Sequence, residues 1–296
     1  MSRPFRFGVN LLSPASAHEW RAKCRRAEDL GYDVLLVPDH LGMPAPFPAL
    51  VAAAEATGRP RLGTFVLNTG FWNPTLLARE IATTDALTGG RLEIGLGAGY
   101  AAAEHESAGL PWGSPGERVD HLAHTVRELK RLYAEDPLQG LLAQESGPPF
   151  LIGGNGDRLL ALTAEHADIA AFTGARDDPG TPGRLLALST EEFAHRVARY
   201  EEFERARRET PVERNLLLQL VEVTDDRAKV VEPLAARSGH LSLDQVLELP
   251  IVLVGTVEEM AQQLIDQRER FGISYLSVLE PSMEALAPVI DVLRGK

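Results

Sequence analysis

The sequence of 296 residues is poor in cysteine and in aromatic side chains: Cys24 is its single cysteine, and Phe, Trp and Tyr make up 6% of the chain. One cysteine cannot form an intrachain disulfide, and it leaves no second thiol for a cysteine-rich metal site. These absences exclude a disulfide-framework protein and a zinc site built from cysteines. A lone cysteine is typical of a protein of the reducing cytoplasm, which is the location that we expect.

Basic residues and long apolar runs are scarce as well. The chain has 30 Lys and Arg against 42 Asp and Glu, a formal net charge of -12 that repels nucleic-acid phosphates and anionic lipid surfaces. The first apolar run, residues 5–12, is too short for a signal segment, and no run approaches the roughly 20 apolar residues of a membrane span. We therefore expect a soluble protein with a small-molecule substrate and without a nucleic-acid or membrane partner.

The chain does have a globular composition, with 44% hydrophobic residues, and one repeated unit. A short apolar run is followed by Gly, Pro, Asn or Ser and then by an amphipathic helical pattern, an order typical of parallel strands joined by helices. Ser16 with Glu19 predicts a capping box at a helix start, as does Ser114 with Glu117. Eight strands are expected, at residues 5–12, 33–37, 62–67, 92–96, 150–152, 169–173, 216–223 and 275–279.

Eight strand-helix units favour an α/β fold of one kind, a single (β/α)8 TIM barrel that takes in residues 1–296. Length alone also allows two domains, since a domain averages about 150 residues, but one barrel commonly needs about 250. A doubly wound sheet usually has fewer strands and a glycine fingerprint in its first turn, which residues 12–15 lack. The excess residues form long insertions in the loops at the C-terminal face, at residues 100–114, 174–189 and 237–250.

The C-terminal ends of barrel strands meet at one rim, where barrel enzymes carry their chemistry. The three long loops on this rim are expected to be lids or substrate walls, or else flexible surface insertions. Asp39 and His40 follow the second expected strand. An imidazole exchanges a proton near neutral pH, and a neighbouring carboxylate can orient it. The alternative is that Asp39 caps the turn and His40 packs passively.

Side chains suited to a flat ring follow the third strand. Phe71 and Trp72 are able to wall such a site, and Asn68 and Thr69 to hydrogen-bond the edge of a heterocycle, although the aromatics fit a core equally well. After the fourth strand, residues 95–99 hold three glycines, including Gly99, but lack the helix of a dinucleotide loop. These glycines allow the backbone to approach a ligand or a neighbouring strand closely.

The run after the fifth strand predicts a phosphate site. Its residues Gly153, Gly154, Asn155 and Gly156 lead through Asp157 and Arg158 into a helix. Free amides at a helix start, exposed by glycines and backed by an arginine, suit a phosphate group, and Arg176 after the sixth strand adds a second cation. The alternative is a glycine-rich turn capped by Asn or Asp.

Metal and serine-nucleophile chemistry are not expected. The chain has no Gly-x-Ser-x-Gly motif, and His121 and His124 are typical of one solvated helix face. Glu104, His105 and Glu106 are able to bind a cation, but they lie in a loop that we expect to be mobile.

The rim residues in this order resemble the luciferase-like superfamily of flavin and deazaflavin oxidoreductases, and in particular its coenzyme F420-dependent branch. The resemblance covers almost the whole chain and is strongest over residues 5–99. It lies in Phe-Gly-Val near the start, Gly-Tyr-Asp before the second strand, Pro-Asp-His after it, Asn-Pro-Thr-Leu-Leu-Ala-Arg-Glu at the third helix, and Gly-Gly-Arg-Leu-Glu-Ile-Gly-Leu-Gly-Ala-Gly through the fourth strand.

The resemblance assigns expected roles. Asp39 and His40 match a pair near the reactive part of the isoalloxazine-like ring, and His40 is expected to orient substrate or ring or to relay a proton. Phe65-Val66 matches the place of a non-prolyl cis peptide that backs the ring, and Asn68 a ring-contacting position. The glycine loop matches the phosphate loop, with Arg176 near a basic phosphate-contacting position.

One departure from the family pattern concerns the substrate. Where the sugar-phosphate dehydrogenase relatives have an acidic glutamate after Gly99, this chain has Tyr100. A sugar-phosphate alcohol is therefore not the expected substrate, and Tyr100, with Glu104, is expected to assist His40.

The resemblance implies hydride transfer between coenzyme F420 and a small organic substrate, by a protein that is a homodimer as its relatives often are. Two alternatives stay open: an FMN-dependent monooxygenase that uses reduced flavin and oxygen, and a non-catalytic flavin-binding barrel.

Overall fold

The computed structural model describes residues 3–134, 139–178, 180 and 185–296 of the chain. Nine strands of the described part form one closed parallel sheet in the order β3-β2-β1-β13-β10-β7-β6-β5-β4, with β3 also paired to β5. Because β3 and β4 are two parts of one interrupted strand, the sheet is an eight-stranded barrel, as predicted. Its strands are β1 Arg6–Asn10, β2 Val34–Val37, β3 Arg61–Thr64, β4 Leu67–Asn68, β5 Leu92–Gly97, β6 Phe150–Gly153, β7 Ile169–Phe172, β10 Glu213–Leu218 and β13 Ile273–Leu279.

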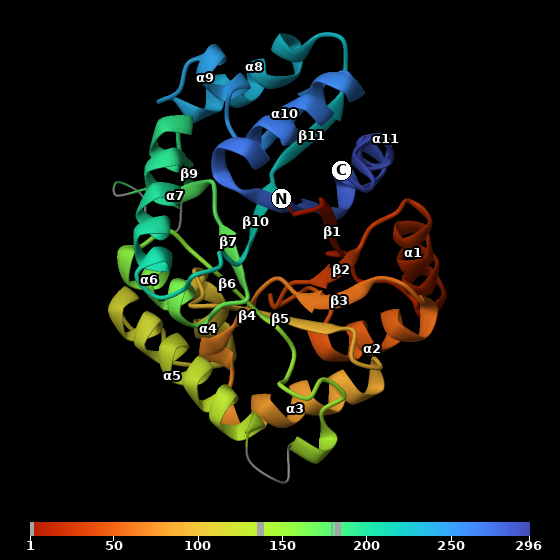
Figure 1. The fold of residues 1–296 in the computed structure, drawn as a ribbon, viewed down its shortest axis with the longest axis vertical. Helices are drawn as coiled ribbons and strands as arrows, with labels where there is room; N and C mark the ends of the chain where they lie inside the picture. Colours follow the sequence, from red (N-terminus) through yellow and green to blue (C-terminus); the bar gives the residue numbers. More distant parts are fainter. Residues whose placement is uncertain (1–2, 135–138, 179, 181–184) are drawn as a thin grey trace.

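Helices surround the barrel (Figure 1) and bury one face each against it. The predicted capping boxes at Ser16 and Ser114 are present, and the Asn73 side chain accepts from the first turn of α3. The helices that follow the barrel strands are α1 Ala17–Asp29, α2 Pro46–Ala56, α3 Pro74–Leu87, α5 Pro115–Tyr133, α6 Asp157–His166, α7 Thr190–Arg205, α10 Val257–Phe271 and α11 Met283–Leu293, with short 3-10 turns at Thr69–Phe71, Gln139–Leu141 and Glu280–Ser282.

The predicted third strand is interrupted where its residues reach the rim. The Phe65-Val66 peptide bond is cis, and it separates β3 from β4. The partly buried Val66 packs on apolar residues inside the barrel. A Cβ on Gly97 of β5 would lie 2.6 Å from Val66 Cγ2, so only glycine at position 97 leaves room for this backbone path.

The opposite, N-terminal end of the barrel is closed by buried charges. Glu93 of β5 accepts from the Arg6 guanidinium at 3.0 Å and lies 3.5 Å from Arg61 Nε, and the Tyr275 hydroxyl donates to it at 3.4 Å. Glu213 pairs with Arg6 at 3.3 Å. Buried carboxylates in contact with partly buried guanidinium groups stabilise this end of the barrel.

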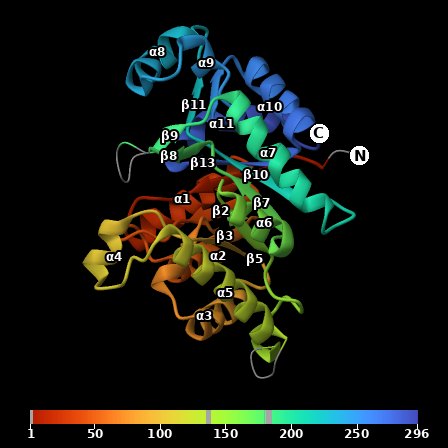
Figure 2. The same cartoon turned by 90° about the vertical axis from the view of Figure 1, so that its left-hand side faces the viewer.

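The three long rim loops contain regular structure that the sequence did not predict. Loop 100–114 holds helix α4 Ala102–Ala108, and loop 237–250 holds α9 Leu243–Leu247. Loop 174–189 holds the antiparallel strands β8 Ala175–Asp177 and β9 Leu185–Ala187, while residues 179 and 181–184 of it lie outside the described residues. Figure 2 shows α4 and the two strands on the same side of the barrel.

The predicted seventh strand is wrong in its extent. It divides at Gln219 into β10 and β11 Leu220–Val223, and β11 leaves the barrel to pair with β12 Val252–Gly255. Helix α8 Arg227–Ser238 lies between β11 and β12 in sequence. In the part of the chain that is described, no helix has the length and apolar character needed to cross a membrane.

Candidate functional site

His40 lies at the rim between a carboxylate and a phenol. Its Nδ1 is 2.8 Å from Glu104 Oε1, and its Nε2 is 3.4 Å from the Tyr100 hydroxyl. The Tyr100 and His40 rings meet edge to face, with centroids 5.4 Å apart. Burial and the nearby Glu104 raise the pKa of Tyr100, so the phenol keeps its proton near neutral pH. The structure thus brings together His40 and Tyr100, the two predicted catalytic residues.

Asp39 does not hold His40, contrary to the role considered for it as the neighbouring carboxylate. Its Oδ2 accepts from the Trp72 indole at 2.8 Å and from the Asn68 backbone N–H at 3.2 Å. Burial raises the pKa of Asp39 despite these two donors. Asp39 therefore ties the end of β2 to β4 and to Trp72, and the His40 ring is held by Glu104 of α4 instead.

The Asn68 side chain is buried, and its amide is oriented by two neighbours, one of which is itself fixed by a backbone carbonyl. Asn68 Oδ1 accepts from the Gly70 N–H at 3.1 Å, and Nδ2 lies 3.0 Å from His105 Nε2. His105 Nδ1 is 2.9 Å from the Pro111 carbonyl. A carbonyl only accepts, so Nδ1 carries the His105 proton and Nε2 accepts from Asn68. In the described part of the chain, the second N–H of Asn68 has no hydrogen-bond acceptor.

His105 and Trp112 are site residues that sequence reasoning missed. The His105 ring is buried between Phe71 and Trp112, with a centroid separation of 4.9 Å to each. A Cβ on Gly70 would lie 2.5 Å from His105 Cε1, so the ring fills the space that this glycine leaves. The predicted mobile loop is wrong at this point, because His105 anchors α4 to the rim. No local signal distinguishes this histidine from a solvated one.

The glycines after β5 place backbone against neighbouring side chains. A Cβ on Gly99 would lie 2.5 Å from Asn68 Oδ1, and Gly99 has a positive φ of 75°. Together with Gly97 against Val66, this leaves a wall made of backbone and small groups beside the Asn68 amide. Such a surface suits a flat ring.

The glycine loop after β6 continues into α6 without a side-chain cap. Gly156 is the N-cap residue, and neither Asn155 nor Asp157 caps the helix. Asn155 Nδ2 instead donates to the carbonyls of Thr173 and Ala175, at 2.8 and 2.5 Å. The alternative of an Asn or Asp cap is therefore wrong, and the first amides of α6 stay available to an acceptor.

The two predicted phosphate-binding arginines lie near this loop, but each has an acidic partner. Arg158 pairs with Asp120 of α5, and Arg176 lies 3.6 Å from Glu192. Asp157, which would repel a phosphate, is itself paired with Arg196 and with Arg199.

A cation site at Glu104, His105 and Glu106 is not formed, because Glu104 and His105 bond to different partners, as described above. In the described portion of the chain no three His, Cys, Asp or Glu side chains converge as metal ligands. The prediction that His121 lies on a solvated helix face is wrong, because its Nε2 lies 2.9 Å from the Thr69 carbonyl.

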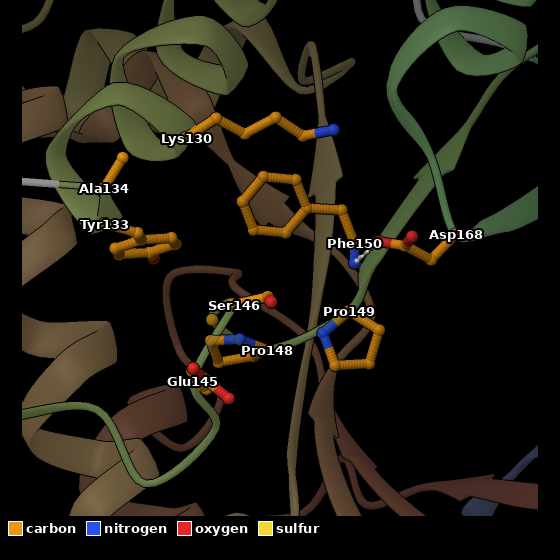
Figure 3. Close-up of a pocket in the computed structure, with 10 residues that line it drawn as sticks. Lys130, Tyr133, Ala134, Glu145, Ser146, Pro148, Pro149, Phe150 and Asp168 are labelled. Atoms are coloured by element: carbon orange, nitrogen blue, oxygen red, sulfur yellow. Dashed lines mark hydrogen bonds between the residues drawn. The ribbon is translucent and has the colours of Figure 1, made fainter. Parts of the chain in front are cut away.

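A hollow of about 660 Å³ lies away from the rim, beside the start of β6 (Figure 3). Figure 3 shows the Lys130 side chain above the Phe150 ring, with Tyr133 to one side, and the Phe150 N–H donates to Asp168 at 2.8 Å. None of the predicted site residues lines it. Because it sits at the N-terminal end of the strands, we do not assign it to the chemistry.

The sequence profile described as luciferase-like monooxygenase matches residues 1–236. The F420-dependent glucose-6-phosphate dehydrogenase of Intrasporangium calvum is 38% identical over 122 residues, which are 38% of this chain and 36% of that protein. The 5,10-methylenetetrahydromethanopterin reductase of Archaeoglobus fulgidus is 28% identical over 172 residues, 55% of this chain and 51% of that protein. The matches thus span about a third to a half of these relatives.

Solved structures share the fold over nearly the whole chain. An F420-dependent secondary alcohol dehydrogenase, solved with an F420-acetone adduct, superposes with a TM-score of 0.76 at 18% identity, covering 99% of this chain and 100% of that chain. The oxygenating constituent of a Pseudomonas putida 3,6-diketocamphane monooxygenase, solved with FMN, gives 0.70 at 15% identity, covering 98% and 95%. At these identities the likeness establishes the barrel.

Proposed function

Because the chain belongs to the luciferase-like monooxygenase family, we propose that it is an oxidoreductase that transfers a hydride between coenzyme F420 and a small organic substrate. The observation that carries the proposal is the pairing of His40 with Tyr100 at the rim, next to the wall formed by Val66, Gly97 and Gly99. F420-dependent relatives among the curated matches support deazaflavin as the cofactor.

The residues present fit such a cofactor. Phe65, Val66 and Gly99 would lie beside its ring. Gly97 and Gly99 leave the room that the Val66 and Asn68 side chains occupy, since a Cβ at either glycine would clash with one of them. The remaining N–H of Asn68 would donate to the ring edge, as its other polar positions are taken. Asp39 would hold this wall in place through Asn68 and Trp72.

The phosphate of the cofactor would bind at the glycine loop. The uncapped start of α6, after the N-cap residue Gly156, offers backbone N–H groups, whereas the Gly154 N–H already donates to the Ala171 carbonyl at 3.3 Å. Asn155 fixes the loop to the end of β7. Arg158 and Arg176 lie near enough in sequence and fold to add charge-assisted bonds once they leave Asp120 and Glu192.

When bound, a deazaflavin supplies a ring carbon that accepts or donates a hydride. The protein holds the substrate oxygen and its proton. His40 Nε2 faces the Tyr100 hydroxyl, so these two atoms are the ones placed to take a proton from a substrate hydroxyl or to return it to a carbonyl. Positioning at such a site lowers the barrier by aligning the reacting atoms.

The substrate that we propose is uncharged. Asp39 and Glu104 are the charged groups that face His40, and both are carboxylates, which repel a phosphorylated sugar. Tyr100, which stands where the sugar-phosphate relatives have an acidic residue, adds a neutral phenol. This keeps a sugar-phosphate alcohol outside the proposal.

Cofactor titration tests the proposal. Apoprotein is titrated with oxidised F420 and, separately, with FMN, and hydride exchange is followed by F420 absorbance with and without oxygen. We expect F420 to bind and turnover to need no oxygen, and His40→Ala to lower turnover about 10²- to 10⁴-fold while F420 still binds. Tight FMN binding without F420 affinity would favour the monooxygenase alternative, and cofactor binding without hydride exchange the non-catalytic barrel.

A homodimer is part of the proposal. Helix α3 exposes Leu76 and Leu87, with 52% and 59% of their surfaces accessible, on the outside of the barrel. Sedimentation of the wild type and of Leu76→Glu with Leu87→Glu tests whether two copies associate through this helix.

A further inference from the structure

We propose that Tyr100, His40 and Glu104 form a proton relay in which Glu104 is the positioning residue: it keeps the His40 proton on Nδ1 and leaves Nε2 to exchange a proton with Tyr100. The relay itself is a property of the protein without cofactor. Its use in hydride transfer rests on the proposed function.

The proton positions follow from the chemistry of the three groups. A carboxylate can only accept a hydrogen bond, so the 2.8 Å contact with Glu104 Oε1 requires the proton on His40 Nδ1. Nε2 of the neutral ring is then an acceptor, and the group facing it is the Tyr100 hydroxyl, at 3.4 Å. A histidine whose one nitrogen is fixed by a carboxylate and whose other meets a hydroxyl is arranged for proton transfer.

Glu104 is held in place by the residue that follows it in α4. The next residue, His105, is buried and bonds to Asn68 and to the Pro111 carbonyl, which fixes the first turns of α4 against the rim. Glu104 Oε2 is buried and has no hydrogen-bond partner in the described part of the chain, so the carboxylate has one bond to the protein, and that bond goes to His40. A carboxylate buried in this way is costly unless it serves a partner that becomes positively charged.

The other titratable groups that face His40 do not compete for its ring. Asp39 belongs to the neighbouring position in sequence, but its Oδ2 is taken by Trp72 and the Asn68 backbone. Tyr100 is 58% exposed, so the outer end of the relay is open to a substrate oxygen. Protons therefore enter at Tyr100 and end at His40, where Glu104 stabilises the imidazolium.

The step balances as an alcohol oxidation. The substrate O–H proton passes to the Tyr100 oxygen as the Tyr100 proton passes to His40 Nε2. The substrate C–H bond would break with its electron pair, which a bound deazaflavin would accept as hydride, and the substrate carbonyl would form. Carbonyl reduction follows the same path in reverse, with the proton returned from His40 through Tyr100.

Nitrogen NMR of the apoprotein tests the relay without cofactor. Histidine ring ¹⁵N shifts and their proton couplings distinguish Nδ1–H from Nε2–H. We expect the wild type and Glu104→Gln, whose amide oxygen still accepts, to carry the His40 proton on Nδ1. Glu104→Ala should give a mixture of tautomers, and Glu106→Gln, on the exposed side of the same helix, should match the wild type. A wild-type proton on Nε2, or an unchanged Glu104→Ala spectrum, overturns the proposal.

Kinetics add the second readout. Glu104→Ala should lower kcat about 10- to 100-fold with KM changed less than about threefold, and Glu104→Gln should lie between it and the wild type, because the tautomer is kept but the charge is lost. Tyr100→Phe should lower kcat by a similar factor. Fixed Nδ1–H in a protein that does not turn over F420 would refute the proposed function alone. Full turnover in Glu104→Ala would refute the relay alone.

Discussion

Gly97→Ala tests whether the wall beside Asn68 is the cofactor surface. The added Cβ would lie 2.6 Å from Val66 Cγ2, whereas carbons in good contact are about 3.5 to 4.0 Å apart. Val66 must therefore move by roughly 1 Å or more, or β5 must shift. Neither move is free, because Gly97 O accepts from the Thr69 hydroxyl at 3.0 Å and Val66 packs on the barrel interior.

The expected cost follows from overpacking. Extra methyl groups in a packed core cost about 1 to 3 kcal/mol, and replacing glycine returns roughly 0.5 to 1 kcal/mol through the unfolded chain. A net loss of about 1 to 2 kcal/mol at an m-value near 3 kcal/mol/M moves the urea midpoint down by about 0.5 M. If the ring lies on Val66, F420 affinity should fall about tenfold or more in addition.

The assay is F420 titration at a urea concentration of zero, together with urea unfolding followed by circular dichroism. Gly58→Ala is the matched control, because its Cβ would meet nothing within 4 Å and Gly58 lies in a surface turn. Gly58→Ala should change the free energy of unfolding by less than about 0.5 kcal/mol and leave the F420 affinity unchanged. A Gly97→Ala protein that is destabilised yet binds F420 as tightly as the wild type would refute the placement of the ring.

Three further outcomes are expected. Glu93→Gln should lower the free energy of unfolding by about 2 kcal/mol in urea titrations, since it removes one of the two carboxylates that pair with the partly buried Arg6 guanidinium. Glu80→Gln in an exposed pair should cost less than about 0.5 kcal/mol, and equal effects would contradict the role of the charged barrel end. Burial raises the pKa of Glu280, but the Lys23 ammonium and two backbone N–H groups outweigh burial, so the pKa is lowered overall. The stabilisation from Glu280 is present above its unfolded pKa of 4.5 and is lost as pH falls through its lower folded pKa. Glu280→Gln should therefore lower the free energy of unfolding by about 1 kcal/mol at pH 7, after allowance for solvent screening, and the difference from the wild type should close below pH 4.5. A difference that does not depend on pH would count against this ion pair. Asn155→Ala should weaken F420 binding about tenfold in calorimetry, because the loop loses its bonds to Thr173 and Ala175, and an unchanged affinity would remove the loop from the site.

Local signals in the sequence were enough for the barrel. A capping box such as Ser16 with Glu19 is satisfied within four residues, so its outcome does not depend on the rest of the fold. Short apolar runs bounded by glycine and proline likewise gave the strands, since parallel strands buried on both faces are apolar along their length. The seventh strand failed because β10 and β11 form one apolar run, and only tertiary pairing with β12 divides it.

The contacts within the site could not be predicted from local sequence signals. His40 and Asp39 are neighbours in sequence, which suggested that the carboxylate orients the ring, yet the partner of His40 is Glu104 of α4. Successive residues leave a rim strand in different directions, so adjacency gives no contact. His105 is a similar case. A histidine between two glutamates is typical of a solvated segment, and only the fold brings Phe71 and Trp112 against its ring.

The net charge of -12 bears on how an anionic cofactor would be held. From the sequence we expect Arg158 and Arg176 to hold it, as local cations in an acidic protein. In the structure both arginines are compensated by carboxylates, and so is Asp157 by arginines, which leaves the loop close to neutral. The backbone N–H groups in the first turn of α6, after Gly156, have no side-chain cap, so they can bind a phosphate without first breaking an ion pair. They are therefore the better-placed donors. Recognition at this loop would then depend on the geometry of the α6 N-terminus, with the arginines adding to it only after their present partners are released.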